Sequence, residues 1–396
     1  MNPRQLFQQH LAPTSPAPVG LHITHAEGCY LYDADGKRYL DLIGGISVCN
    51  VGHRHPRVVG AIKAQADQYL HVMVYGELLQ SPQIDYAKLI TDHLPPSLNS
   101  VYFTNSGAEA VEGAIKLARR LTGRSNIIAC RNSYHGSTTG ALALLGDEYW
   151  RTAFRPLMPG VFHYDYNSAE LIDAIDADTA CVVVETVQAE GGIILPGHSW
   201  LQALRKKCDA AGTLLILDEI QCGFGRTGSL FAFEQWGIVP DVLLLGKALG
   251  GGLPLGAFIA SGERMMALAD NPVLGHITTF GGHPLSCAAG KAALEALLEE
   301  DMIAGVAEKA ALFHQLLVHP AIKEVRSAGL LMAIELADSD CVLKALQHCL
   351  REGLFSDWFL FAPHCIRIAP PLIITTEEIR EACRIILESL DSARHI

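Results

Sequence analysis

Short runs of consecutive apolar residues alternate with longer helical segments through the middle of the chain. Strands are predicted at the runs 101–103, 126–130, 180–184, 214–217, 242–245 and 256–260. Helices are predicted after several of these runs, as at 200–210. An apolar run without polar alternation is typical of a strand that is covered on both faces. The pattern therefore predicts an α/β fold with a mainly parallel sheet and helices on both sides.

The two ends of the chain follow a different pattern. Residues 1–20 are rich in proline and glutamine and predict a loosely attached arm, and two short strands are predicted around the turn 33–36. A long helix at 284–298 leads to a mixture of strands and helices that ends in a helix at 376–390. We expect a large domain at 50–290 and a smaller α+β domain formed by 1–49 and 291–396.

The run 242–245 ends in a single lysine, Lys247, within DVLLLGKALGGG. An ammonium group is costly to bury, so a partly desolvated lysine has a lowered pKa and a free amine suited to Schiff-base chemistry. The alternative is a lysine that points into water. Ligands of open parallel sheets bind at the carboxyl ends of the strands, where Ser106, Asp218 and Lys247 are all expected.

Several turns near these positions also have two possible interpretations. Ser106-Gly107-Ala108 precedes a helix and could bind phosphate, or Ser106 could simply cap the helix together with Glu109. Asp218 could pair with a heteroaromatic N–H or end its strand. Tyr134 could stack on a planar cofactor or pack on the core. The turn 278–282 could contact phosphate through its hydroxyl groups or only begin the next helix.

Composition excludes several classes of protein. The 396 residues are 49% hydrophobic and 18% charged with a net charge of -12, which is typical of a globular protein and argues against nucleic acid as a partner. The 11 cysteines form no C-x-x-C pair, so we expect a reducing compartment, the cytoplasm. No apolar run predicts a membrane span or a signal peptide. The spacing of His53 and His55 does not favour a metal site.

The segment 223–228 matches G-x-G-x-x-G, a pattern found in dinucleotide-binding folds. However, DEIQC separates it from the preceding strand, and GRTGSLFAFEQWG is a poor start for a helix. The next strand leads to Lys247 and not to an acidic residue. We therefore do not expect a nicotinamide dinucleotide.

The order Asp218, Gln221, G-x-G-R-T-G and Gly246-Lys247 resembles that of the class III (ornithine/acetylornithine-like) aminotransferases, which use pyridoxal phosphate. Other matching stretches are YLDLIGGISVCNVGHRHP, TNSGAEAVEGAIKLAR, SYHG, ETVQAEGG, DVLLLGKALGGGLPLGA, TTFGGHP and IRIAPPL. The resemblance covers nearly the whole chain. It implies a fold type I enzyme and a homodimer with active sites at the interface between the subunits.

The resemblance also implies a role for each matching residue at the cofactor. Lys247 resembles the lysine that bonds to the cofactor, and Asp218 the partner of the pyridine nitrogen. Gln221 is similar to the donor to the ring hydroxyl. The other implied contacts are phosphate binding by Ser106, Gly107 and Ala108, phosphate binding across the dimer by Thr279, and packing on the two ring faces by Tyr134 and Ile220.

Substrate binding is implied for Arg367, which resembles the arginine that grips a carboxylate, and for Glu190, which resembles the glutamate that shields it. The chain departs from the family at Ser137. Ornithine, acetylornithine and 4-aminobutyrate members have arginine after Tyr-His-Gly, and a serine cannot clamp a second carboxylate. Arg151 and Arg155 are candidates to replace it. Thr14 stands where ornithine enzymes have a tyrosine.

We therefore expect a transaminase that moves an amino group from a primary amine or an ω-amino acid to an α-keto acid. The expected partners are these small molecules and a second copy of the chain. Alternatives on the same scaffold are an aminomutase, a decarboxylase or an ω-amine:pyruvate-type transaminase. A non-catalytic relative would be expected to lack Lys247 or Asp218, and both are present.

Overall fold

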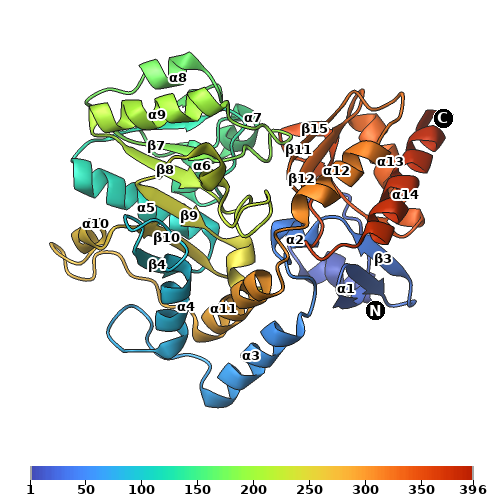
Figure 1. The fold of residues 1–396 in the computed structure, drawn as a ribbon, viewed down its shortest axis with the longest axis horizontal. Coiled ribbons are helices and arrows are strands. Elements are labelled where there is room, and N and C mark those ends of the chain that lie inside the picture. Colours follow the sequence, from blue (N-terminus) through green and yellow to red (C-terminus); the bar gives the residue numbers. More distant parts are fainter. Residues whose placement is uncertain (1, 395–396) are drawn as a thin grey trace.

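A seven-stranded sheet forms the centre of the computed structural model, which describes residues 2–394 (Figure 1). In spatial order its strands are β4 (Ser100–Thr104), β10 (Gly256–Ala260), β9 (Val242–Leu245), β8 (Leu214–Asp218), β7 (Thr179–Glu185), β5 (Asn126–Cys130) and β6 (Val161–Tyr164). Within this sheet β10 runs antiparallel to both its neighbours, and the other pairs are parallel. The α/β prediction with a mainly parallel sheet is confirmed.

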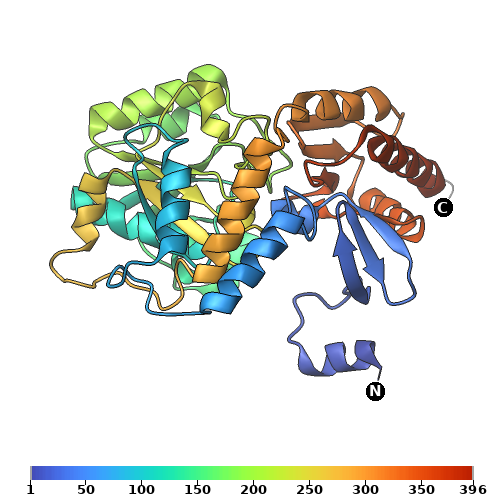
Figure 2. The ribbon, with the colours of Figure 1, turned by 60° about the horizontal axis from the view of Figure 1, so that its bottom comes forward.

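The central strands are buried on both faces, as their uninterrupted apolar runs predict. Ile216 and Leu244 pack in one core with helix α5, whereas the alternate residues Leu215 and Leu243 pack in the other core. Helices α3, α4 and α11 lie side by side in front of the sheet (Figure 2). The helices that surround the sheet are α3 (Pro56–Gln68), α4 (Ser81–Thr91), α5 (Gly107–Thr122), α6 (Thr139–Leu144), α7 (Glu148–Arg151), α8 (Ala169–Asp173), α9 (His198–Ala211), α10 (Gly262–Met265) and α11 (Pro284–Glu299), with 3-10 turns η1 (Thr152–Phe154), η2 (Ala232–Trp236), η3 (Lys247–Gly250) and η4 (Met266–Leu268).

The two ends of the chain come together in a smaller part beside the large sheet (Figure 1). One small sheet has the order β1-β2-β3-β13 and the other β11-β12-β15-β14. The short strand β13 pairs with β3 and so joins the C-terminal segment to the N-terminal one. The elements of this part are α1 (Pro3–His10), β1 (Ile23–Glu27), β2 (Tyr30–Asp33), β3 (Arg38–Asp41), α2 (Gly44–Ser47), α12 (Val306–Leu316), β11 (Glu324–Ala328), β12 (Leu331–Glu335), α13 (Ser339–Arg351), β13 (Leu354–Phe355), β14 (Trp358–Phe359), β15 (Ala362–Ile368) and α14 (Thr376–Arg394). The domain boundaries at 50 and 290 stay a prediction, and position 290 lies within α11.

Three local predictions need correction. The arm 1–20 contains helix α1, because Asn2 and Gln5 form a capping box and Pro3 occupies the first turn, although no residue of that helix is buried. The two strands predicted around the turn 33–36 are present as β2 and β3, and a third strand, β1, was not predicted and precedes them across a tight connection at Gly28 (φ 57°). Strand β6 was not predicted because it lies at the sheet edge and has no buried run.

The G-x-G-x-x-G segment at 223–228 is a turn that joins the two parts of the molecule. The guanidinium of Arg226 is fully buried and donates to the carbonyls of Leu330 and Pro370 and to the side chain of Asn50. Burial lowers the pKa of Arg226 to about 9. The glycines therefore permit a tight turn around a buried structural arginine, and they do not open a phosphate-binding helix.

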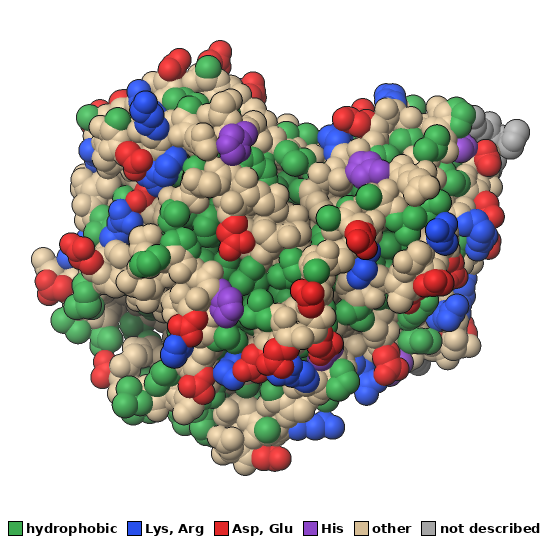
Figure 3. Space-filling model, viewed as in Figure 1, with side chains coloured by type: hydrophobic (Ala, Val, Ile, Leu, Met, Phe, Trp, Pro, Cys, Tyr) green, Lys and Arg blue, Asp and Glu red, His purple; other side chains and the backbone are tan. Residues whose placement is uncertain are grey.

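The surface is consistent with the 18% of charged residues in the sequence, which include both signs. Acidic and basic side chains are interspersed on the face in Figure 3, and a notch separates the two parts at its upper edge. Within residues 2–394 no helix is both long and apolar enough to cross a bilayer.

Candidate active site

A pocket of about 260 Å³ opens at the carboxyl ends of β8 and β9 and collects most of the predicted cofactor-binding residues. It is lined by Ser106, Gly107, Ala108, Tyr134, Ser137, Asp218, Ile220, Gln221 and Lys247, together with His135, Gly136, Glu185, Val187 and Cys222. These residues come from distant segments of the chain, and the first and the last of them, Ser106 and Lys247, are 141 positions apart in the sequence. The parallel sheet brings them to one edge.

The start of helix α5 provides an anion-binding wall of this pocket. Ser106 caps the helix by accepting from the Glu109 amide at 3.2 Å, whereas the Glu109 carboxylate accepts from Asn105. The capping box is thus only half formed. The amides of Gly107 and Ala108 have no acceptor within the helix and line the pocket, which suits a phosphate. A Cβ atom at position 107 would lie 2.8 Å from Cδ1 of Ile220, so glycine allows this side chain to keep its place beside the pocket.

A buried carboxylate, Asp218, lies at the end of β8. Its oxygens accept from the Ile220 amide at 2.9 Å and contact Nδ1 of His135 at 2.7 Å. Glu185 stands opposite Asp218 on β7. Burial, together with the charge of Asp218, raises the pKa of Glu185 well above its usual range. The neutral form of Glu185 is favoured by these two effects, whereas the backbone amides of Tyr134 and Ala189, which donate to its carboxyl oxygens, oppose them.

Lys247 follows β9 at the floor of the same pocket. Its backbone is in the left-handed region with φ 48°, which is uncommon for a residue other than glycine and directs the side chain out of the strand. Nζ donates to Oε1 of Gln221 at 3.1 Å. Burial lowers the pKa of Lys247, so a larger fraction of this amine is unprotonated than of an exposed lysine.

A second pocket adjoins the first and shares Tyr134 and Lys247 with it. Arg367 lies in this second pocket and donates from Nη1 and Nη2 to the two carboxylate oxygens of Glu190 at 2.8 and 2.9 Å. Burial opposes ionisation of Glu190, but the charge and hydrogen bonds of Arg367, together with the Leu360 amide and the charge of Lys247, lower the pKa of Glu190. The guanidinium also lies over the Phe359 ring at 4.4 Å.

Asp357 adds a second carboxylate to this arginine, with Oδ1 2.9 Å from Nε of Arg367. The contact is an ion pair without the alignment of a hydrogen bond. Burial raises the pKa of Asp357 to about 6, although Arg367 opposes the shift. Arg367 thus faces two acidic groups, and a substrate carboxylate must compete with both of them.

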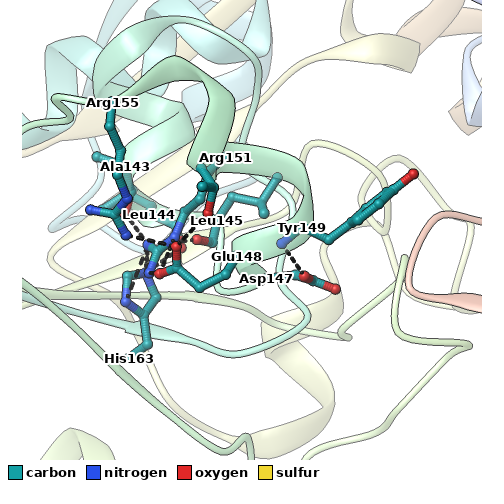
Figure 4. A network of polar contacts seen from close by, with 10 residues as sticks. Ala143, Leu144, Leu145, Asp147, Glu148, Tyr149, Arg151, Arg155 and His163 are labelled. Atoms are coloured by element: carbon teal, nitrogen blue, oxygen red, sulfur yellow. Dashed lines mark hydrogen bonds and ion pairs between the residues drawn. The ribbon is translucent and has the colours of Figure 1, made fainter.

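Some predicted residues lie elsewhere. Thr279 is exposed and does not line either pocket of its own chain, and Thr14 is also exposed. Arg151 and Arg155 both bind the carboxylate of Glu148 (Figure 4). The idea that one of these arginines replaces the missing clamp is therefore not supported, because neither side chain lines the pockets around Lys247.

Three residues near the ligand space were not among the predicted site residues. His135 follows Tyr134 directly, and Glu185 ends a buried strand beside Asp218, so both could have been found from their position after a strand. Nothing in the sequence around Asp357 indicates that this residue lies near the ligand. It lies next to β14, in the smaller part, and reaches Arg367 only through the pairing of β14 with β15.

The family of the chain follows from comparison with known proteins. The model of the family "Aminotransferase class-III" matches residues 12–390. The chain belongs to the class III aminotransferases. This transaminase is 39% identical to the acetylornithine aminotransferase of Methanopyrus kandleri over 98% of the chain and 99% of the relative. It is also 39% identical to that of Caldanaerobacter subterraneus subsp. tengcongensis, over 94% of the chain and 95% of the relative.

Solved structures agree with this assignment. The ornithine aminotransferase of Toxoplasma gondii has a TM-score of 0.91 and 31% identity, covering 99% of this chain and 94% of its own, and pyridoxal phosphate partly occupies its active site. A transaminase from the marine bacterium Virgibacillus has a TM-score of 0.92 and 26% identity, covering 99% of each chain. The aminotransferase described here uses pyridoxal phosphate and has the fold type I architecture. The helix start at Gly107, the carboxylate of Asp218 and the amine of Lys247 fit that cofactor.

Proposed function

We propose that this aminotransferase transfers an amino group from a primary amine or an ω-amino acid, of the acetylornithine or ornithine type, to an α-keto acid held by Arg367. The observation that carries the proposal is the position of Lys247. It lines both the pocket that contains Asp218 and the pocket that contains Arg367. An amine in reach of Lys247 is therefore also in reach of a carboxylate-binding group.

The role proposed for each residue follows from its place in the pocket that contains Lys247. Pyridoxal phosphate, when bound, acts as an electron sink for the carbon that loses a proton. Gly107 and Ala108 would hold its phosphate, and Tyr134 and Ile220 would enclose its ring. Asp218, positioned by His135 and the Ile220 amide, keeps the ring nitrogen protonated.

Lys247 is proposed to move the proton. Its lowered pKa favours an unprotonated Nζ. This amine would accept the proton from the substrate carbon that carries the amino group and then deliver it to the cofactor carbon. Gln221 accepts from Nζ at 3.1 Å and keeps the amine inside the pocket between these two steps, besides serving as a donor to the ring hydroxyl. Because Glu190 already neutralises Arg367, an uncharged group can occupy the second pocket until a keto-acid carboxylate displaces Glu190.

We also propose a cytoplasmic homodimer in which Thr279 contacts the phosphate bound by the other subunit. Thr279 is exposed next to Phe280, whose side chain is 53% exposed. Other apolar side chains nearby in sequence or on neighbouring loops are also accessible, Val273 at 72% and Leu79 at 95%. Such exposure supports an interface with a second copy. The eleven cysteines are unpaired, which fits a reducing compartment.

The catalytic proposal is tested with purified holoenzyme. Acetylornithine, ornithine and a series of primary amines are added separately, and the absorbance of the bound cofactor is recorded. A transaminase passes to the aminated form without carbon dioxide release and returns when an α-keto acid is added. Carbon dioxide release, or no response to any amine or amino acid in the series, would contradict the proposal.

The shared site is tested by mixing two inactive variants. Lys247→Ala removes the amine, and Thr279→Glu places a negative charge against the partner's phosphate. After unfolding and refolding together, a mixed dimer contains one site with both native residues. We expect activity to return in the mixture and not in either variant refolded alone. No recovery, with dimers present by sedimentation, would contradict the placement of Thr279.

A further inference from the structure

A third cavity, of about 290 Å³, adjoins the two pockets described above. Its wall is made by Leu142 of α6, Leu145, Trp150 of α7 and Phe154 of η1, with Leu360 from the smaller part. Tyr134 and Ser137 complete it. We name this cavity the apolar subsite.

The charges nearest to the apolar subsite are held away from it. Arg151 donates to Glu148 and to the carbonyl of Leu145 at 3.0 Å, and its guanidinium lies 3.1 Å from His163 (Figure 4). Arg155 donates to the other oxygen of Glu148 at 2.6 Å. Among residues 2–394 no charged side chain lines this cavity. Its polar groups are the hydroxyls of Tyr134 and Ser137, which lie 3.0 Å from each other.

The apolar subsite is continuous with the reacting centre. Tyr134 lines all three cavities, Ser137 is shared with the Lys247 pocket, and Leu360 is shared with the Arg367 pocket. A substrate whose reacting carbon lies at Lys247 can therefore extend past Tyr134 into a space walled by leucine, tryptophan and phenylalanine. A carboxylate placed there would meet apolar side chains and gain no cation, which is unfavourable relative to its hydration in water.

We propose that the apolar subsite selects keto acids whose far end is an uncharged alkyl or aryl group, so that the acceptor carries a single carboxylate, bound by Arg367. This inference rests on the proposed aminotransferase activity and specifies the substrate class. Trp150, Phe154 and Leu142 are the specificity-determining contacts. The dicarboxylic 2-oxoglutarate is then a poor acceptor, because its second carboxylate meets this apolar wall.

The test compares acceptors that differ only at their far end, with one amine donor throughout. Linear 2-oxo acids from 2-oxobutanoate to 2-oxohexanoate are set against 2-oxoglutarate, and kcat/KM is measured for each. Each added methylene should raise kcat/KM roughly threefold to fourfold, the usual gain for a buried CH₂. 2-Oxopentanoate, which has a methyl group where 2-oxoglutarate has a carboxylate, should be preferred by about a hundredfold. A flat series, or a preference for 2-oxoglutarate, overturns the proposal.

Variants locate the selectivity. Trp150→Ala should reduce the gain in kcat/KM per added methylene, because the variant removes part of the apolar wall that the methylenes contact. Ser137→Arg should raise kcat/KM for 2-oxoglutarate at least tenfold and lower it for 2-oxohexanoate. The matched control is Thr139→Arg, which adds the same charge at an exposed position that does not line the cavity. Equal effects of the two arginines would show that net charge, and not the subsite, sets the preference.

Failure of the subsite and failure of the proposed function give different results. If the cofactor spectrum responds to amines and pyruvate but the acceptor series is flat, only the subsite is wrong. If no amine or amino acid changes the spectrum, the proposed function is wrong as well. If Trp150→Ala folds poorly, the acceptor series is measured with Trp150→Phe and Phe154→Ser instead. Both positions are partly exposed, so these substitutions change the wall of the apolar subsite without disturbing the buried core.

Discussion

The two sides of the active site are built differently. The side that fits the cofactor is formed at one edge of the large sheet, where Ser106, Asp218 and Lys247 lie at or just beyond the carboxyl ends of β4, β8 and β9. The substrate side combines short helices of the large part with residues next to β14 in the smaller part, and contains Arg367 and Asp357. The residues proposed to contact the cofactor are thus positioned by the large sheet. Specificity depends on segments that share no strand and can vary independently.

The largest effect that separates the two sides should come from Lys247→Ala. Removal of Nζ eliminates the proposed proton carrier, and general acid–base groups contribute about 10² to 10⁴ in rate. We expect kcat to fall by at least about 10⁴-fold, since the covalent contact with the cofactor is also lost. Single-turnover kinetics check this, with the exposed Lys206→Ala as the control. Turnover within tenfold of the native enzyme would remove Lys247 from the mechanism.

Arg367→Gln tests the substrate side and should affect both activity and stability. The change leaves Glu190 and Asp357 without their buried cation, and loss of one partner of a buried ion pair costs about 3–5 kcal/mol. We expect KM for the keto acid to rise about a hundredfold and the free energy of unfolding to fall, as measured by denaturant titration.

A double variant separates these two effects. Combining Arg367→Gln with Glu190→Gln should restore part of the stability, because one of the two unpaired carboxylates is gone and only that of Asp357 is left, but it should not restore keto-acid binding. If the double variant recovers the native KM, the carboxylate is bound by another group. Cofactor affinity should stay unchanged in both variants, because Arg367 does not line the pocket that contains Asp218.

A smaller effect is expected from Gly107→Ala on the cofactor side. The new Cβ would lie 2.8 Å from Cδ1 of Ile220, so that flexible side chain must shift toward the space of the cofactor ring. We expect cofactor affinity to fall about tenfold, corresponding to about 1.4 kcal/mol, in a titration of the cofactor-free protein. Gly60→Ala is the matched control, because its Cβ meets no atom within 4 Å and it lies in helix α3. An equal loss in both variants would point to a general effect on folding.

The contrast between the two sides also explains how far the sequence alone could be interpreted. The strands β8 and β9 contain uninterrupted apolar runs, and parallel strands place their carboxyl ends together, so the convergence of Ser106, Asp218 and Lys247 was predictable. Their implied roles came from the order of the motifs, and Glu190 and Arg367 came from the family resemblance alone.

The remaining features depend on contacts between segments distant in the chain. Trp150 and Leu360 meet only when the smaller part packs against the large sheet, and no periodicity in either segment marks that contact. Arg151 is a candidate for the second carboxylate-binding group on sequence grounds alone, because it follows Tyr134 at a short distance along the chain. The contacts of Arg151 with Glu148 and a carbonyl are not visible in the sequence. The pairing of Asp357 with Arg367 likewise requires the register of β14 against β15.

The smallest expected effect is a pH dependence that belongs to the substrate side alone. Burial raises the pKa of Asp357 to about 6, whereas burial of Glu190 is outweighed by Arg367, the Leu360 amide and Lys247, which lower the pKa of Glu190. As pH falls from 8 to below 6, Asp357 takes up a proton and stops competing with a substrate carboxylate for Arg367, while Glu190 stays ionised. KM for the keto acid should therefore fall severalfold toward acid pH. In Asp357→Asn the KM should be low and flat over this range. A native KM that rises on acidification, or the same slope in the variant, would show that another group governs carboxylate binding.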